Sequence, residues 1–88
     1  MKIIVHTPAG LAEILHSARK ERGLTQTQVA ARLGIGQPRL SALETTGTAS
    51  ISLEQMLALF ALYDLELCVQ TRHGQTPQYE AREDGPEW

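Results

Sequence analysis

Apolar residues near the start of the chain recur at the spacing of one helix face. Four of them stand at positions i, i+3, i+4 and i+7: Leu11, Ile14, Leu15 and Ala18. Thr7 offers a capping hydroxyl, Pro8 suits the first helical position, and Gly23 is the residue type that commonly ends a helix. The pattern predicts an amphipathic helix from about residue 8 to about residue 22.

Two shorter helices are predicted next, on either side of a glycine-containing turn. Thr25 and Gln28 form a Thr-x-x-Gln capping box at the start of the first, and Gly34 ends it. The second begins near Gln37, with Pro38 in the first turn, where no backbone donor is needed. Its predicted inward positions, three residues apart, are Leu40 and Leu43.

A fourth helix is predicted from Ser52, which forms a second capping box with Gln55. Its apolar residues leave no clean polar face: Leu53, Met56, Leu57, Leu59, Phe60, Leu62 and Tyr63. A helix that is apolar nearly all round has to be covered on more than one side. We therefore expect Leu59, Leu62 and Tyr63 to contribute to a dimer interface, with a purely internal core as the alternative.

After this helix the apolar period changes to two, which is typical of a β-strand. Leu65, Leu67 and Val69 alternate with polar or small residues and complete the set expected at the dimer interface. A single strand requires a partner. Residues 2–6, which are also β-prone, and the same strand of a second chain are the two alternatives.

These elements predict an all-α fold of four to five short helices, plus a short C-terminal β-strand that pairs across a dimer. Residues 1–72 form the predicted domain. Residues 73–88 have no apolar period and are predicted to be a flexible acidic tail that ends in Trp88.

Length and composition indicate a small globular protein and exclude several kinds of stabilising or binding site. The chain has 88 residues, 42% hydrophobic and 20% charged, which is ordinary for a small globular domain. A single cysteine, Cys68, excludes an internal disulfide and a cysteine-based zinc site. The three histidines are scattered along the sequence, so we expect no metal and no cofactor. No run is apolar enough to span a membrane and no signal-peptide pattern is present, so we expect a cytoplasmic protein.

The acidity of the chain lies in the tail. Residues 1–72 carry seven basic and six acidic side chains, a net charge of +1, whereas residues 73–88 carry one basic and four acidic side chains, a net charge of −3. The net charge of −2 therefore does not argue against nucleic-acid binding by the domain, provided that its cations gather on one face.

The segment TQTQVAARLGIGQPRLSALE, residues 25–44, resembles the helix-turn-helix of the Cro/CI (XRE) family of repressors. Residues at the family's matching positions are Thr25, Gln26, Ala30, Gly34, Gln37, Leu43 and Glu44. The resemblance implies a lambda-repressor-like fold that binds double-stranded operator DNA. It also implies an internal ion pair between Arg19 and Glu44, rather than a DNA contact by Arg19.

The length, the strand that follows the fourth helix and the final Glu87-Trp88 together resemble HipB-type antitoxins. That narrower resemblance implies a homodimer that binds a HipA-like Ser/Thr kinase toxin, either one chain or a split pair. Tryptophan is enriched among interface anchors, so Trp88 is the predicted point of docking for this partner.

We expect the residues that contact DNA bases to lie in the first turns of the third helix, because a helix fits the major groove. Gln37 can pair with adenine, Arg39 can reach guanine or a phosphate, and Ser41 is small enough to approach a base edge. The resemblance adds Gly36 and Pro38 as base-facing positions. Predicted phosphate contacts, at the start of the second helix and in the loop after the third, are Thr25, Gln26, Thr46 and Thr48.

No nucleophile-base pair, carboxylate pair or phosphate loop is visible, so we do not expect an enzyme. The leading hypothesis is an antitoxin that represses its own operon by binding a palindromic operator. Two alternatives are a stand-alone regulator of the same family without a toxin partner, and a protein-interaction module that no longer binds DNA.

Overall fold

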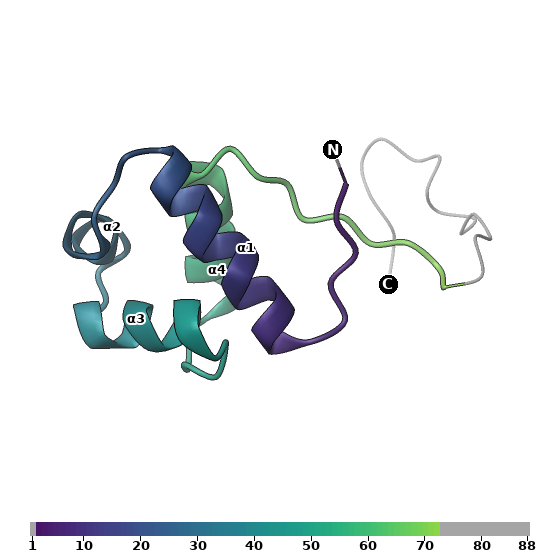
Figure 1. Cartoon of the computed structure of the whole chain (residues 1–88), viewed down its shortest axis with the longest axis horizontal. Coiled ribbons are helices and arrows are strands. Elements are labelled where there is room, and N and C mark those ends of the chain that lie inside the picture. The colour runs from purple at the N-terminus through teal and green to yellow at the C-terminus, as the bar shows by residue number, and fades with distance from the viewer. Residues whose placement is uncertain (1, 73–88) are drawn as a thin grey trace.

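The computed structural model describes residues 2–72, which fold into four helices (Figure 1). They are α1 (Pro8–Glu21), α2 (Gln26–Leu33), α3 (Gln37–Thr45) and α4 (Leu53–Leu62). The predicted all-α class is confirmed, with four helices in the described part of the chain. Among these helices none is long and apolar enough to cross a bilayer.

The helices begin at the residues that the capping patterns predict. The Thr7 hydroxyl accepts a hydrogen bond from the Gly10 amide at 3.0 Å. Thr25 and Ser52 each form a reciprocal capping box with the glutamine three residues later. Helix α3 differs, because its N-cap is Gly36, which has no side chain to bond the free amides of the first turn.

Each helix ends at or just before a residue in the left-handed conformation. Glycine fills this position after α1, α2 and α3, with φ of 67° at Gly23, 71° at Gly34 and 73° at Gly47. After α4 the residue is Asp64, with φ of 58°. The Leu65 amide donates to the Phe60 carbonyl at 2.7 Å, which closes the last turn of α4 and directs the chain away from the bundle.

The core lies where α3 packs against α1 and α2, and α4 covers it from the side of α2. Four side chains have essentially no exposed surface: Leu15, Val29, Leu40 and Leu59. Ala30, Leu43, Phe60 and Tyr63 complete the buried cluster. Every helix therefore contributes to one core, which fixes the two helices of the predicted helix-turn-helix relative to each other.

Residues 65–71 leave α4 as extended chain and form no strand. No backbone hydrogen bond joins residues 2–6 to residues 65–69 in the described structure. Pairing of the predicted strand across a dimer needs a second chain and remains a prediction. The predicted acidic tail, with Trp88, lies outside the described residues.

Candidate nucleic-acid interface

The exposed first turn of α3 is the centre of the candidate interface. Gln37, Pro38 and Arg39 are all exposed there, and Gly36 precedes them as the N-cap. Ser41, one turn further on, is half-buried. Together with Gln26 at the start of α2, these residues form what we call the recognition surface: Gln26, Gly36, Gln37, Pro38, Arg39 and Ser41.

A chain of hydrogen bonds runs from this surface into the core. The amide nitrogen Nε2 of Gln37 donates to Oε1 of Gln26 at 2.6 Å. Nε2 of Gln26 donates in turn to Oε1 of Glu44 at 3.2 Å. The side chain of Glu44 is buried, so the inner end of the chain is fixed. The sequence pattern predicts that both glutamines face DNA, but it does not reveal that they bond each other.

These bonds determine how the Gln37 amide faces solvent. Gln26 is held with its nitrogen toward a carboxylate, so its oxygen must face Gln37 and must accept. One N–H of Gln37 is used in that bond, and among residues 2–72 no partner takes the other N–H or the carbonyl oxygen. A free donor beside a free acceptor is the pattern that pairs with N7 and N6 of adenine in the major groove.

Arg19 and Glu44 form an ion pair between α1 and α3, with Nε and Oε2 2.7 Å apart. A second guanidinium nitrogen of Arg19 donates to the Leu24 carbonyl at 2.8 Å. The hydrogen bond to Glu44 raises the pKa of Arg19 above its ordinary value, against the opposing effect of burial. Because the guanidinium is held inside the fold, it is not offered to DNA.

The three threonines predicted to contact phosphate already use their hydroxyls in hydrogen bonds within the fold. The Thr25 hydroxyl caps α2 by accepting from the Gln28 amide at 3.1 Å. In the loop after α3, the hydroxyls of Thr46 and Thr48 lie 2.6 Å apart, and Thr46 also donates to the Ala42 carbonyl at 3.1 Å. This arrangement orders the loop. Phosphate contact by Thr25, Thr46 and Thr48 stays a prediction.

Cations near the recognition surface are few. Arg39 is exposed and forms no ion pair within the described residues. Arg32, at the end of α2, is also exposed. Arg22 caps the C-terminal end of α1, where its Nη2 lies 3.4 Å from Oδ2 of Asp64. Arg39 and Arg32 are therefore the positive charges available on α2 and α3.

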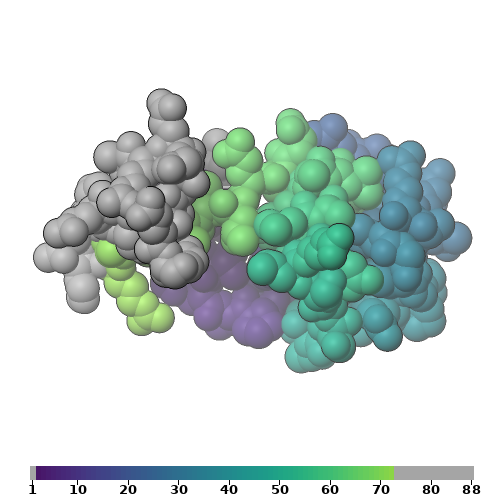
Figure 2. All heavy atoms as spheres, turned by 180° about the vertical axis from the view of Figure 1, so that it is seen from behind, coloured from purple at the N-terminus to yellow at the C-terminus, as the bar shows by residue number. Residues whose placement is uncertain are grey.

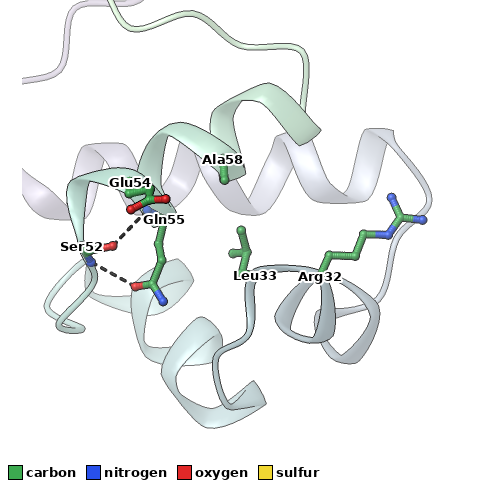
Figure 3. Close-up of a pocket in the computed structure, with 6 residues that line it drawn as sticks. All are labelled: Arg32, Leu33, Ser52, Glu54, Gln55 and Ala58. Atoms are coloured by element: carbon green, nitrogen blue, oxygen red, sulfur yellow. Dashed lines mark hydrogen bonds between the residues drawn. The ribbon is translucent and has the colours of Figure 1, made fainter.

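A hollow lies between the end of α2 and the start of α4 (Figure 3). Its lining residues are Arg32, Leu33, Ser52, Glu54, Gln55 and Ala58. The side-chain oxygens of Ser52 and Gln55 each accept a hydrogen bond from the backbone N–H of the other residue, as the dashed lines show. Ser52 and Gln55 thus serve to cap α4, and the charged side chains that line the hollow are Arg32 and Glu54.

The predicted dimer residues divide into two groups. Leu59 and Tyr63 are 0% and 3% exposed in a single chain, so they belong to its own core and add no area to a contact between two chains. This corrects the expectation for these two residues. Leu62 and Leu65 pack partly against the core, whereas Leu67 and Val69 are exposed.

Exposed apolar residues also lie on α4 and in the segment before α1. Leu53 and Leu57 lie on the outer side of α4, and Ile3, Ile4 and Val5 lie before α1. Their apolar character was visible, but which side of a mostly apolar helix faces inward depends on packing.

Comparison with known proteins agrees with this geometry. A family model described as Helix-turn-helix matches residues 15–69. Two solved structures are similar to the chain, each at 21% sequence identity: one described as "Structure of HipA-HipB-O2-O3 complex", with a TM-score of 0.68, and one described as "HipB-O4 20mer complex", with a TM-score of 0.65. Each comparison covers 81% of this chain and 99% of the other. A search of curated proteins gives no match.

Proposed function

This chain belongs to the helix-turn-helix family of the Cro/CI (XRE) type, and we propose that it acts there as an antitoxin-like repressor of its own operon. In this role it binds palindromic operator DNA as a homodimer and also binds a HipA-like Ser/Thr kinase toxin. The observation that carries the DNA-binding part is the orientation of Gln37 by Gln26 and Glu44. A side chain that is already oriented loses little conformational entropy when it meets a base.

The recognition surface suits one half-site of an operator. Helix α3 has nine residues, enough to enter the major groove with its N-terminal turns against the bases. Few cations support it, so a single copy has little electrostatic affinity for the phosphates. Two copies that read half-sites about 34 Å apart supply the affinity that one lacks.

The toxin-binding part is supported by the similarity in fold to the HipB chain of a HipA-HipB complex. At 21% identity this likeness establishes the fold alone, so the partner is an inference of ours. Trp88, outside the described residues, is the proposed docking point.

Two alternatives make different predictions. A stand-alone regulator binds its operator and co-purifies with no kinase-like protein. An interaction module without DNA binding shows no preference between operator and scrambled DNA, and the near-neutral charge of residues 1–72 is the feature that favours this class. A gene for a kinase-like protein next to this one favours the antitoxin.

The DNA-binding proposal is tested by fluorescence anisotropy on the duplex upstream of the chain's own gene, with a scrambled duplex for comparison. We expect preferential binding that Gln37→Ala weakens by about 1–3 kcal/mol. Gln70→Ala, which removes the same side chain from an exposed position beyond α4, is the matched control and should change nothing. Equal, weak binding to both duplexes by all three proteins would exclude autorepression.

The partner proposal is tested by co-expression with the neighbouring kinase-like protein. Deletion of residues 74–88, or Trp88→Ala alone, should abolish co-purification and leave operator affinity unchanged. A truncated chain that retains the partner as well as the full chain would remove Trp88 from the interface.

A further inference from the structure

Two extended segments at one end of the molecule carry unpaired backbone groups. Residues 2–6 lead into α1 and residues 65–69 follow α4, and Figure 1 shows both reaching past the helices at the end away from α2. In the described structure no backbone hydrogen bond involves residues 2–6 or 66–69. Unpaired strand edges of this kind are templates for pairing with another chain.

Both segments also expose apolar side chains. Ile3, Ile4 and Val5 are 56%, 64% and 43% exposed, and Leu67 and Val69 are 55% and 83% exposed. The space-filling view from behind shows the same end of the molecule, where the extended green segment passes the purple start of the chain (Figure 2). Within residues 2–72, this end of the molecule therefore carries apolar side chains that the helices leave exposed.

The alternation of side chains in the two segments is compatible with a shared sheet. If the segments pair, Ile3 and Val5 fall on one face, together with Leu65, Leu67 and Val69. Val5 is less exposed than Ile3 and Ile4, and it lines a groove with Leu11 and Met56 to which the next residue, His6, also contributes. Lys2, Ile4 and His6 then share the outer face with Glu66 and Cys68.

The charges favour pairing of unlike segments. Residues 2–6 carry Lys2 and no acidic residue, and residues 65–69 carry Glu66 and no basic residue. Opposite charges across neighbouring strands stabilise a sheet, whereas two copies of the first segment side by side would bring like charges together. The charges therefore favour residues 2–6 as the outer neighbour of residues 65–69, and they add nothing to the central pair of identical segments, which both carry Glu66.

We propose that residues 2–6 of one copy pair with residues 65–69 of a second copy, so that the intersubunit strand pair becomes a four-stranded sheet. The proposal rests on the homodimer of the proposed function. Two strands alone are marginally stable in water, and a sheet of more strands with an apolar face is stable. A two-fold arrangement forms this contact twice and closes at two copies, while Lys2 and the nearby Pro8 discourage further pairing at the outer edge.

The test is a cross-link between two distinguishable copies of the full chain. Ile4→Cys/Cys68→Ser carrying a size tag is mixed with untagged wild type, whose single cysteine is the exposed Cys68. A short bismaleimide should link tagged to untagged chains. Leu53→Cys/Cys68→Ser, with a cysteine at a similarly exposed site on α4, is the control and should not link to Cys68.

Two results would overturn the proposal. One is a link that forms only within single chains when Ile4→Cys is combined with the native Cys68. The other is the absence of any link from position 4 while sedimentation shows wild type to be a dimer. A wild type that sediments as a monomer at every concentration would overturn the homodimer itself, so the two failures are distinguishable.

A charge exchange provides a second readout that does not depend on cysteine geometry. We expect Lys2→Glu to raise the dissociation constant of the dimer about tenfold, and Lys2→Glu/Glu66→Lys to restore it. An unchanged dissociation constant in the single variant contradicts pairing between these segments.

Discussion

The side chain of Gln26 connects Gln37, on the recognition surface, to the buried side chain of Glu44. It accepts from Gln37 and donates to Glu44, so its removal frees the Gln37 amide to rotate and leaves one carboxylate oxygen of Glu44 without this donor. Gln26 therefore orients Gln37, in addition to the phosphate contact that is predicted for it. The two roles have different consequences for binding energy.

We expect Gln26→Ala to weaken operator binding by about 1–2 kcal/mol, much of it through Gln37. In a double-mutant cycle, Gln26→Ala and Gln37→Ala should then cost less together than the sum of the single losses. Anisotropy on the operator duplex measures all four corners of the cycle. Losses that simply add would show that Gln26 acts only on a phosphate.

Tyr63 illustrates a buried polar atom with no partner in the described structure. Its hydroxyl oxygen has no hydrogen bond, although the side chain lies in the core. An unsatisfied buried hydroxyl costs about 1–3 kcal/mol, so Tyr63→Phe should leave the free energy of unfolding unchanged or raise it by about 1 kcal/mol. Urea unfolding at fixed protein concentration measures this, and a clear loss would show that a water satisfies the hydroxyl.

Tyr63 should also make the free energy of unfolding depend on pH. Burial raises the pKa of Tyr63 from 10.0 to about 12, with the charge of Glu44 adding and that of Arg19 opposing. Between these values the folded chain keeps a proton that the unfolded chain has lost, so stability falls as pH rises from about 10 to about 12. Tyr63→Phe should lack this part of the decline when both proteins are unfolded in urea across that range.

Among the elements, the turn after α3 is the most constrained. Gly47 has a left-handed backbone, and a Cβ built there would collide with the carbonyl oxygen of Pro8 and lie 2.9 Å from its Cβ. Gly23 has a similar backbone, but a Cβ there would meet nothing within 4 Å. Alanine substitutions at the two glycines therefore separate the loss of stability caused by the left-handed backbone from the loss caused by the contact with Pro8.

We expect Gly23→Ala to lower the free energy of unfolding by about 1–2 kcal/mol through the left-handed conformation alone. Gly47→Ala adds the clash, so its loss should reach about 3–5 kcal/mol. Thermal and urea unfolding of both variants provide the comparison. Equal losses would mean that the start of α1 moves aside without cost.

The helices were predictable because their ends are set by local chemistry. Thr7, Thr25 and Ser52 cap helices through side chains within three residues, and such patterns are visible in the sequence. The side of α4 that faces inward was not predictable in the same way. Its residues are apolar nearly all round, so only the packing of the whole chain places Leu59 inside and Leu53 outside.

At the scale of the molecule, the proposed base-reading and dimer surfaces are carried by different elements. Gln37 lies at the start of α3, whereas Leu67 lies in the extended chain after α4. A substitution in one surface should therefore leave the other intact. The candidate DNA residues could be predicted from the helix-turn-helix spacing, while the bond between the two glutamines required the relative placement of two helices.

We expect Leu67→Lys to dissociate the dimer and to weaken operator binding more than tenfold, because one copy then reads only one half-site. Leu53→Lys, at a comparably exposed apolar position, is the matched control and should remain dimeric. Sedimentation and anisotropy report the two effects. Dissociation by Leu53→Lys instead would place the interface on the outer side of α4.

The salt dependence of binding should be shallow. With about two phosphate-neutralising cations per half-site, the logarithm of the binding constant should fall with the logarithm of salt with a slope of about −4 for the dimer. Anisotropy at several salt concentrations measures the slope. A slope twice as steep would reveal cationic contacts beyond Arg39 and Arg32.

The absence of a side chain at Gly36 has a consequence for how operator specificity can evolve. Its φ of −74° is ordinary for any residue, and a Cβ there would meet only the Pro38 ring at 3.7 Å. New side chains at this position are thus compatible with the fold, so mutations can change base preference without first requiring a compensating change in stability. After gene duplication, a single codon change at Gly36 could separate the operators of two coexisting copies while both keep the same architecture.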